Sequence, residues 1–526
     1  MSRFLTLSKG RRHVPALLVA AVGCIVYLVW QPPSNDLAVA DFRIELFRRA
    51  PFAIWNNQWF AGHHTVSYSL LAPLFGSILG THLFGVTSAM LGSWFGSMVI
   101  HRVADEHESL RRPGLAAALF AIGVLSSLYG GRLTFLSGVV LGTAAILVAL
   151  RGKAWPIVLL GVLTSLSSPV AGMFVAVIGC AAFCSKAMSR SVSASLAVAP
   201  VVTAAAVALL FPEGGTFPFP IGGLVNVLLV CAGIAAVGWR YHFVRWLALG
   251  YGAFCIISAF PQTPIGGNAA RLAALAGPAA FVMLAGLAVQ WIAAGLVALT
   301  VLQWAPVSLT FRQDSEQADP AFYAPLLEAV RNTPGPQRVE VVPVATHGEA
   351  DVVALEVPIA RGWNRQLDRK YNALFYEDPV ETRLDPDDYL AWLNEHGVSL
   401  VAIADTELDE SGLLEQQLLE SPPSYLRLIH QDEVWRVFEV LPDPGLVGGD
   451  AVVTDLAVDT FTLTVFSGGD MHVRIRFSPW FRVTAGDACV LEDEGGWTIV
   501  RAKGRGIVRV APTLSLTAVW DRDGDC

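Results

Sequence analysis

The decisive stretch of the chain reads Val14-Pro-Ala-Leu-Leu-Val-Ala-Ala-Val-Gly-Cys-Ile-Val-Tyr-Leu-Val-Trp30, followed by Gln31-Pro-Pro-Ser-Asn-Asp-Leu-Ala-Val-Ala-Asp-Phe-Arg43. A second polar sequence, Trp55-Asn-Asn-Gln-Trp-Phe-Ala-Gly-His-His64, comes before the next long apolar run. The apolar run is long enough for a membrane-spanning helix. We therefore expect a first span, followed by a polar loop rich in carboxylates, arginines, tryptophans and histidines.

The whole chain has the composition of a polytopic membrane protein. It has 526 residues, of which 54% are hydrophobic and 15% charged, and its mean hydropathy is +0.52. These values are too apolar for a soluble enzyme. Since a span needs roughly 20 apolar residues, we expect about eleven spans. Their ranges are 14–30, 82–101, 113–129, 133–150, 157–168, 170–184, 192–211, 221–238, 247–260, 270–287 and 289–305.

The basic residues predict an orientation. Thirteen Lys and Arg residues, Arg3 and Lys9 among them, fall on one side of the expected spans, and five fall on the other. Lys and Arg accumulate in cytoplasmic segments, so we expect a cytoplasmic N-terminus. The first apolar run lacks a convincing small-residue cleavage site, which favours a retained span over a signal peptide. An odd number of spans then places the C-terminal half outside the plasma membrane.

The C-terminal half has the composition of a water-soluble protein. Residues 306–526 contain 18 basic and 37 acidic residues, whereas residues 1–305 contain 18 and 7. Runs rich in β-branched residues predict buried strands, and an aspartate followed by proline predicts the start of a helix. We expect strands at 339–343, 399–404 and 435–440 and a helix at 385–397. This mixture predicts an α/β domain.

Alternating strands and glycine-rich turns follow after Pro444. We expect strands at 461–466, 471–477, 497–501 and 506–510, a spacing typical of a small β-sandwich. The predicted domains are a membrane domain at 1–305, an extracytoplasmic α/β domain at 306–443 and a β-sandwich at 444–526. Cys489 and Cys526 lie in the half where an oxidising compartment permits a disulfide, and the sequence leaves their pairing open. It contains no CxxC or HExxH motif, so it does not suggest a structural zinc site.

The polar residues expected on the outer side suit one kind of chemistry. Glycosyl transfer to a hydroxyl needs a carboxylate that accepts the proton. Arginine, or a metal held by histidine and carboxylates, stabilises the charge that grows on a phosphate leaving group. Each residue taken alone is better explained as a solvated loop charge or an interfacial anchor, whereas the loop as a set favours the catalytic interpretation. The candidates are Asp36, Asp41, Arg43, Glu45, Arg48, Arg49, His63, His64, Arg132 and Arg271.

The aromatic and histidine residues of the second polar sequence have alternative interpretations. Trp55 and Trp59 best fit an aromatic belt at the membrane interface, with rings that stack on a sugar as the alternative. His63 and His64 have the chemistry to bind a divalent metal, to contact phosphate or simply to form hydrogen bonds. The sequence leaves these alternatives open.

Several motifs, taken in order, resemble the GT-C superfamily of integral-membrane glycosyltransferases, in particular actinobacterial members often labelled transporters. The resemblance spans most of the chain. The motifs are Trp55-Asn-Asn-Gln-Trp-Phe-Ala-Gly-His-His64, Tyr68-Ser-Leu-Leu-Ala-Pro73, Gly131-Arg-Leu-Thr-Phe135, Gly267-Asn-Ala-Ala-Arg-Leu272, Arg361-Gly-Trp-Asn-Arg-Gln-Leu-Asp368, Lys370-Tyr-Asn372 and Ser478-Pro-Trp-Phe-Arg482.

The resemblance implies an inverting glycosyltransferase that acts at the outer face of the plasma membrane. The donor would be a polyprenyl-phosphate-linked sugar, and the acceptor a cell-envelope glycan or glycoconjugate. Asp41 best fits the catalytic acidic residue of the first external loop, with Asp36 in reserve. No adjacent Asp-Glu or Asp-Asp pair is present in that loop, so no metal site is assigned and the need for a divalent metal stays open. Donor-phosphate candidates are Arg132, Arg271, Asn268, Arg48 and Arg49, and substrate-binding candidates are Trp55, Trp59, His63 and His64. We expect Arg132 and Arg271 to converge on the donor phosphate, although they are far apart in the sequence.

Two other functions fit the sequence less well. A transporter or flippase of envelope precursors would usually show repeated groups of spans and charges within the spans, and neither is visible here. A non-catalytic scaffold with glycan-binding outer domains would not depend on Asp41. In all three interpretations the expected partners are membrane lipid and a glycan or its lipid-linked precursor, and no nucleic acid is expected.

Overall fold

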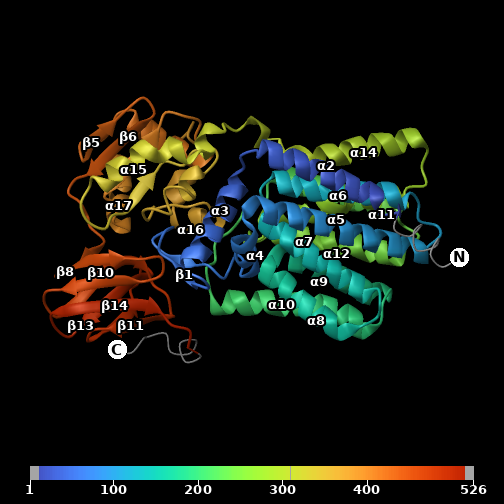
Figure 1. Ribbon diagram of the computed structural model, residues 1–526, viewed down its shortest axis with the longest axis horizontal. Helices are drawn as coiled ribbons and strands as arrows, with labels where there is room; N and C mark the ends of the chain where they lie inside the picture. The colour runs from blue at the N-terminus through green and yellow to red at the C-terminus, as the bar shows by residue number, and fades with distance from the viewer. Residues whose placement is uncertain (1–10, 309, 516–525) are drawn as a thin grey trace. The chain divides into compact units, whose positions relative to one another are not determined.

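The computed structural model describes residues 11–308, 310–515 and 526, so Arg3 and Lys9 of the charge count lie outside the described residues. The chain divides into two compact units, which we describe separately (Figure 1). The helical unit comprises Met1–Ala40, Tyr68–Leu209 and Gly214–Gln313. The mixed unit comprises Asp41–Ser67, Leu210–Glu213 and Asp314–Cys526.

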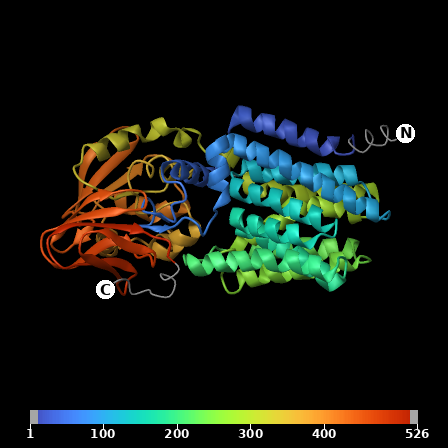
Figure 2. The ribbon, with the colours of Figure 1, turned by 60° about the horizontal axis from the view of Figure 1, so that its bottom comes forward.

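Apolar helices coincide with each of the eleven ranges expected to be spans, and Figures 1 and 2 show them running alongside one another. Their prediction as helices is confirmed. The helices are α2 (Val14–Trp30), α5 (Thr81–Glu106), α6 (Pro113–Tyr129), α7 (Leu133–Ala149), α8 (Ala154–Ser167), α9 (Pro169–Ser185), α10 (Arg190–Leu210), α11 (Ile221–Val237), α12 (His242–Ala259), α13 (Arg271–Leu284) and α14 (Val289–Trp304). The short helix α4 (Leu71–Leu79) precedes α5.

Several of these helices are long and apolar enough to cross a membrane. Five segments of the described chain meet this condition, and a bent helix pair at the N-terminus adds a sixth if it counts as one span. Five more apolar helices have between 10 and 17 residues. The expected number of about eleven spans therefore stays a prediction, because the shorter helices fall below the roughly 20 residues of an untilted span.

The first polar segment is not the loop that we expected. Most of it forms helix α3 (Asn35–Arg49), which follows α2 after a bend of 80°. Asp36 lies in the first turn and Arg48 and Arg49 in the last, so the charges complement the helix dipole. Glu45 also lies within 3.4 Å of Arg49, one turn away on the same face. The prediction was wrong because the density of carboxylates and arginines suggested a loop, whereas Leu37, Ala40, Ile44 and Phe47 recur at the spacing of one helix face.

The α/β part of the mixed unit follows the sequence closely. Its sheet has the order β3 (Val339–Val341), β4 (Leu400–Ala404), β6 (Trp435–Val440) and β5 (Leu426–Gln431); β3 and β4 are parallel and the other neighbours antiparallel. Helices α15 (Ala324–Arg331), α16 (Arg365–Tyr371), α17 (Pro386–His396) and α18 (Leu413–Leu419) accompany the sheet. Asp385 caps α17 through the amides of Asp387 and Asp388, and Gly397 ends it in the left-handed region. The expected helix and strands are thus confirmed.

Two antiparallel four-stranded sheets form the C-terminal part of the mixed unit. Their orders are β12-β13-β10-β7 and β11-β14-β9-β8, and apolar side chains from both sheets share one core. The strands are β7 (Val447–Gly448), β8 (Ala451–Leu456), β9 (Phe461–Val465), β10 (Gly469–Arg476), β11 (Phe481–Ala485), β12 (Ala488–Glu492), β13 (Trp497–Ala502) and β14 (Gly506–Pro512). The four expected strands correspond to β9, β10, β13 and β14. A disulfide joins Cys489 to Cys526, which answers the question that the sequence left open.

Two short segments from the first half of the chain belong to the mixed unit. Residues 41–67 include the hairpin of β1 (Trp55–Asn56) and β2 (His63–His64), and residues 210–213 precede Gly214. The backbone N–H of Asn57 donates to the carbonyl of Val458, and that of Ile359 donates to the carbonyl of Gln58. These segments are therefore built into both parts of the mixed unit, although our predicted boundary at residue 305 assigned them to the membrane domain.

A proline inside the helical unit explains a buried polar residue. Pro278 of α13 has no N–H group, so the carbonyl of Ala274 loses its usual helical donor. The side-chain amide of Gln303 on α14 donates to that carbonyl at 2.7 Å, and Gln303 is only 1% exposed. Gly123 on α6 permits this approach, since a Cβ there would lie 2.6 Å from the Gln303 amide nitrogen. In an apolar environment each freed backbone group must find such a partner.

We predict that Gln303→Leu destabilises the protein by about 0.5–2 kcal/mol, because the Ala274 carbonyl then has no donor. The midpoint of thermal unfolding in detergent measures this effect. Val301→Leu is the matched control, since Val301 is 63% exposed on the same helix. An equal midpoint for Gln303→Leu and the control would show that the hydrogen bond does not stabilise the helix pair.

Candidate functional site

Three charged side chains from distant parts of the sequence meet in the helical unit. The Nε of Arg132 lies 3.4 Å from the Oδ2 of Asp36, and the Nη2 of Arg271 lies 3.7 Å from the same oxygen. We call Arg132 and Arg271 the arginine pair. Because both guanidinium groups reach one oxygen atom, they are close enough to share a single small anion.

The position of Arg132 depends on a glycine turn between α6 and α7. Arg132 is the residue immediately before α7, and Gly131 before it has a φ of +68°, a conformation that glycine adopts without strain. A Cβ at Gly131 would collide with the backbone of Leu37 and with the hydroxyl of Ser34. Glycine at this position therefore lets the turn approach the start of α3, where Asp36 lies.

Arg271 reaches the same place from a different turn. It begins α13, directly after the 3-10 helix η1 (Gly266–Ala270), and its backbone N–H donates to the carbonyl of Asn268. Its guanidinium lies over the ring of Phe135, 5.5 Å from the centroid, and Phe135 is on α7, one turn beyond Arg132. The half-buried Asn268, a donor-phosphate candidate, is thus in the turn that positions Arg271.

The charges of this cluster do not balance. Two guanidinium groups face one carboxylate, and the three side chains are 18%, 20% and 33% exposed for Arg132, Arg271 and Asp36. The Nε of Arg132 is buried and has no hydrogen-bond partner among the described residues. Charge-assisted contacts gain strength away from bulk water. The cluster therefore has the charge and the free donor capacity to bind an anion.

Arg48 and Arg49, the other two arginine candidates, belong to the mixed unit and are engaged there. Both lie within 3.4 Å of Glu45, and Arg49 also donates to the carbonyl of Leu355 and lies 3.9 Å from Glu356. Their side chains are 45% and 41% exposed. Exposed pairs of this kind contribute little to stability, and they fit a solvated helix end.

Asp41 has a carboxylate neighbour that the sequence did not reveal. Asp41 lies half-buried on α3 in the mixed unit. Burial and the negative charges of Asp41 and Glu45 raise the pKa of Asp351 well above its ordinary value. The Oδ1 of Asp351 is buried without a hydrogen-bond partner among the described residues. The two carboxylates are far apart in sequence, so no local motif signals their proximity.

The two tryptophans proposed as substrate-binding residues are part of the core of the mixed unit. Trp55 is 2% exposed among the residues of the sandwich core, and its indole N–H donates to the Oδ1 of Asn57. Trp59 is fully buried, stacks on Phe42 at 4.1 Å and donates to the carbonyl of Ala350. Stacking on a sugar or at a membrane interface requires an accessible ring, so both alternatives are replaced by a packing role.

His63 and His64 are buried as well. Burial and the charge of Arg43 lower the pKa of His63 well below its ordinary value. The Nδ1 of His64 lies 2.8 Å from Glu213, and its Nε2 lies 3.1 Å from the hydroxyl of Ser478. Among the described residues no group of three or more His, Cys, Asp and Glu side chains has the arrangement of a metal site.

The chain Ser478–His64–Glu213 has the order of a hydrolase triad, but its surroundings favour a structural role. Ser478 is 0% exposed, and its hydroxyl accepts a hydrogen bond from the backbone N–H of Trp480. A nucleophile must reach a substrate carbonyl, which a fully buried serine does not. The three residues come from residues 41–67, residues 210–213 and the sandwich, so their hydrogen bonds join these segments of the mixed unit.

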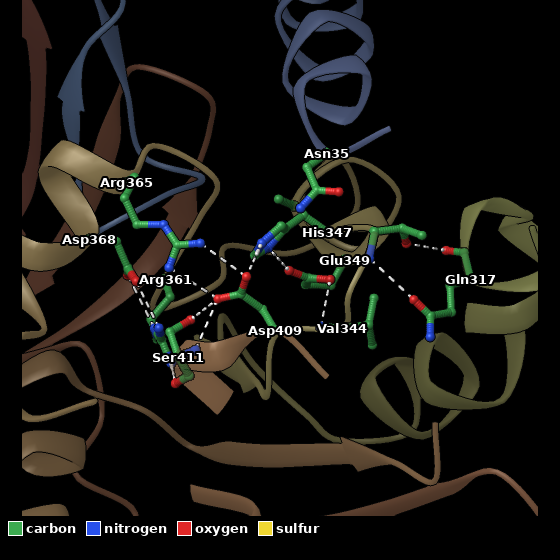
Figure 3. Close-up of polar contacts among 12 residues, drawn as sticks. Asn35, Gln317, Val344, His347, Glu349, Arg361, Arg365, Asp368, Asp409 and Ser411 are labelled. Carbon is green, nitrogen blue, oxygen red and sulfur yellow. Dashed lines mark hydrogen bonds and ion pairs between the residues drawn. The ribbon is translucent and has the colours of Figure 1, made fainter. Parts of the chain in front are cut away.

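The Arg361–Asp368 motif forms an internal ion pair (Figure 3). Two nitrogens of Arg361 contact the two oxygens of Asp368 at 3.1 and 2.7 Å. Burial opposes ionisation, but the charge and hydrogen bonds of Arg361 keep the pKa of Asp368 below its ordinary value. Glu340 and Glu415 lie 3.8 and 3.9 Å from Arg361. Removing one partner of a buried pair is strongly destabilising, so this motif has a structural role inside the α/β part.

A second buried network lies beside it (Figure 3). His347 lies 3.1 Å from Glu349 and 3.3 Å from Asp409, and Arg365 contacts Asp409 at 3.0 Å. Burial opposes protonation of His347, but the carboxylates of Asp409 and Glu349 raise its pKa to about 9. His347 is therefore a cation at neutral pH, stacked 3.7 Å from the ring of Trp363. Sequence reasoning missed this network because its members are spread over some sixty residues without a repeated spacing.

A scan against known protein families and a search of curated proteins find no match to the chain.

We predict that Asp351→Asn makes the stability of the mixed unit less sensitive to rising pH. A carboxyl group with a raised pKa in the folded protein stabilises it fully at low pH, and this contribution is lost as the pH rises from about 4 through the folded-state pKa. The asparagine does not ionise, so the variant should gain stability relative to wild type as the pH rises. Thermal unfolding of the full-length protein between pH 4 and 8 measures this.

The control is Asp455→Asn, which replaces an exposed aspartate on β8. Parallel pH profiles for wild type and Asp351→Asn would show that Asp351 ionises as freely as an exposed residue.

Proposed function

We propose that the protein is a membrane glycosyltransferase of the GT-C type. In this proposal it takes a sugar from a polyprenyl-phosphate donor at the outer face of the plasma membrane and transfers it, with inversion, to a cell-envelope glycan or glycoconjugate. The observation that carries the proposal is the arginine pair, which converges on Asp36 from two separate turns of the helical unit.

The chemistry of the reaction explains why this observation matters. The acceptor hydroxyl attacks the anomeric carbon, the bond between that carbon and the phosphate oxygen breaks, and the lipid phosphate leaves with an additional negative charge. Guanidinium groups placed in advance stabilise such a leaving group. Planar guanidinium also binds phosphate through two parallel hydrogen bonds. In this proposal Asp36 is the counter-ion that keeps the arginine pair together before the donor binds.

The proton of the acceptor hydroxyl needs a base, and we assign that role to Asp41. The assignment rests on the resemblance of the first polar segment to the GT-C superfamily. Asp36 already contacts both arginines, which supports Asp41 as the better candidate. The orientation, with a cytoplasmic N-terminus and an outer C-terminal half, rests on the unequal distribution of Lys and Arg. The need for a divalent metal stays open.

We predict that Arg132→Lys and Arg271→Lys each lower transfer roughly 100-fold, because a point charge does not replace the two-pronged guanidinium contact. The measurement is the envelope glycan of a deletion strain complemented with wild type or variant. Arg102→Lys is the control, since Arg102 is an exposed residue paired with Glu106. If the arginine pair only anchors helices at lipid headgroups, lysine serves equally well, and full complementation by both variants would refute the phosphate role.

We further predict that Asp41→Asn lowers transfer by about 10²–10⁴ while the protein still folds and inserts, because the amide does not accept the proton. Asp455→Asn, which replaces an exposed aspartate on β8, is the control. Complementation by Asp41→Asn would remove Asp41 as the base. An unchanged envelope glycan in the deletion strain, together with accumulation or loss of a lipid-linked precursor, would favour a transporter over a transferase.

A further inference from the structure

Four aromatic side chains of the helical unit contact one another in a cluster that we call the aromatic shelf. The ring of Phe311 stacks on Trp30 at 5.2 Å with an angle of 14°, and on Trp304 at 6.4 Å with an angle of 21°. Tyr129 lies 5.7 Å from Trp304 and 6.3 Å from Phe311. Trp30 is 53% exposed and Phe311 is 43% exposed. The shelf thus presents a broad, partly uncovered aromatic surface.

The shelf is assembled where three helices end together. Trp30 is the last residue of α2, Tyr129 the last of α6 and Trp304 the last of α14. α6 packs against both α2 and α14, and the three helices lie side by side in Figure 1. Phe311 comes from the 3-10 helix η3 (Thr310–Arg312). A scattered aromatic belt would present single rings around the unit, whereas these rings come from distant sequence positions and contact one another.

The shelf adjoins the arginine pair through two connections within the helical unit. Tyr129 is followed by Gly130, Gly131 and Arg132, the turn that packs against Leu37. At the other end, the side-chain amide of Gln313 donates to the Oδ1 of Asn35, the residue before Asp36. An apolar surface and a pair of cationic groups are therefore adjacent.

We propose that the aromatic shelf binds the first isoprene units of a polyprenyl phosphate whose phosphate contacts the arginine pair. This inference rests on the proposed function and identifies the part of the donor that the shelf recognises. The surplus positive charge of the cluster matches the phosphate, and flat aromatic rings match the flat double bonds and methyl groups of polyisoprene. When the apolar chain covers the exposed rings, both the chain and the rings lose contact with water or lipid headgroups, which favours binding.

The test is direct binding of undecaprenyl phosphate to the purified full-length protein in nanodiscs, followed by native mass spectrometry. Dodecyl phosphate, which has the same headgroup on a saturated chain, is the second probe. The variants are Trp30→Ala and Phe311→Ala, with Trp291→Ala as the matched control. Trp291 is 63% exposed but lies near the opposite end of α14. Thermal unfolding of each variant confirms that it is folded, and Trp30→Phe keeps an aromatic ring if Trp30→Ala does not fold.

We expect Trp30→Ala and Phe311→Ala to weaken binding of undecaprenyl phosphate roughly tenfold, because each substitution removes an aromatic ring that would otherwise cover the isoprene chain. Dodecyl phosphate binding should weaken less, because its saturated chain lacks the flat double bonds that match the rings, and Trp291→Ala should bind both probes like wild type. Arg132→Gln should weaken both probes. Equal binding of undecaprenyl phosphate by wild type and both shelf variants would overturn the inference, as would an equal loss in Trp291→Ala.

This binding experiment separates the inference from the proposed function. If the shelf variants lose undecaprenyl phosphate but no envelope glycan depends on the arginine pair, the lipid site stands and the transferase proposal fails. If glycan transfer depends on the arginine pair but the shelf variants retain the lipid, the shelf inference alone fails.

Discussion

The partial compensation of two arginines by one carboxylate, Asp36, is the interaction on which the proposed site in the helical unit depends. Without Asp36, two guanidinium groups would face each other in a partly buried place, which is costly unless an anion joins them. The geometry that brings them together comes from a glycine turn before α7 and a 3-10 turn before α13. The carboxylate of Asp36 thus contacts the two arginines where an external anion would contact them. This correspondence is the physical basis of the proposed phosphate site.

The sequence predicted well those features that depend on local physics. The apolar runs form helices because each run by itself supplies a continuous apolar surface that can be buried. Asp385 caps α17 and Gly397 ends it, as expected. Helix α3 was missed because its charged residues suggested a loop, although Leu37, Ala40, Ile44 and Phe47 lie at helical spacing. The role of Gln303 depends instead on a neighbouring helix, in which Pro278 leaves a carbonyl without its usual donor.

The candidate site was less predictable, because it depends on contacts between distant segments. The sequence predicted that Arg132 and Arg271, at two span ends, lie close together, and the structure brings both guanidinium groups together, but nothing local indicates that both reach Asp36. Asp351 could not be proposed from its own neighbourhood, since its raised pKa reflects burial and the charges of Asp41 and Glu45 on α3. The tryptophans and histidines of residues 55–64 were overinterpreted, because polar and aromatic residues near a membrane suggest a surface, whereas here they are part of an interior.

That last difference affects how the motifs are understood. Trp55, Trp59, His64 and Arg361 are all nearly or fully buried, and their polar atoms are engaged within the mixed unit. A substitution at any of them leaves a cavity or an unpaired buried group, so loss of activity there would follow from loss of folding. The arginine pair and Asp36 are between 18% and 33% exposed and carry unbalanced charge. Partly exposed, unbalanced charge contributes little to folding, so the proposed phosphate site explains the meeting of these three side chains better than a structural role does.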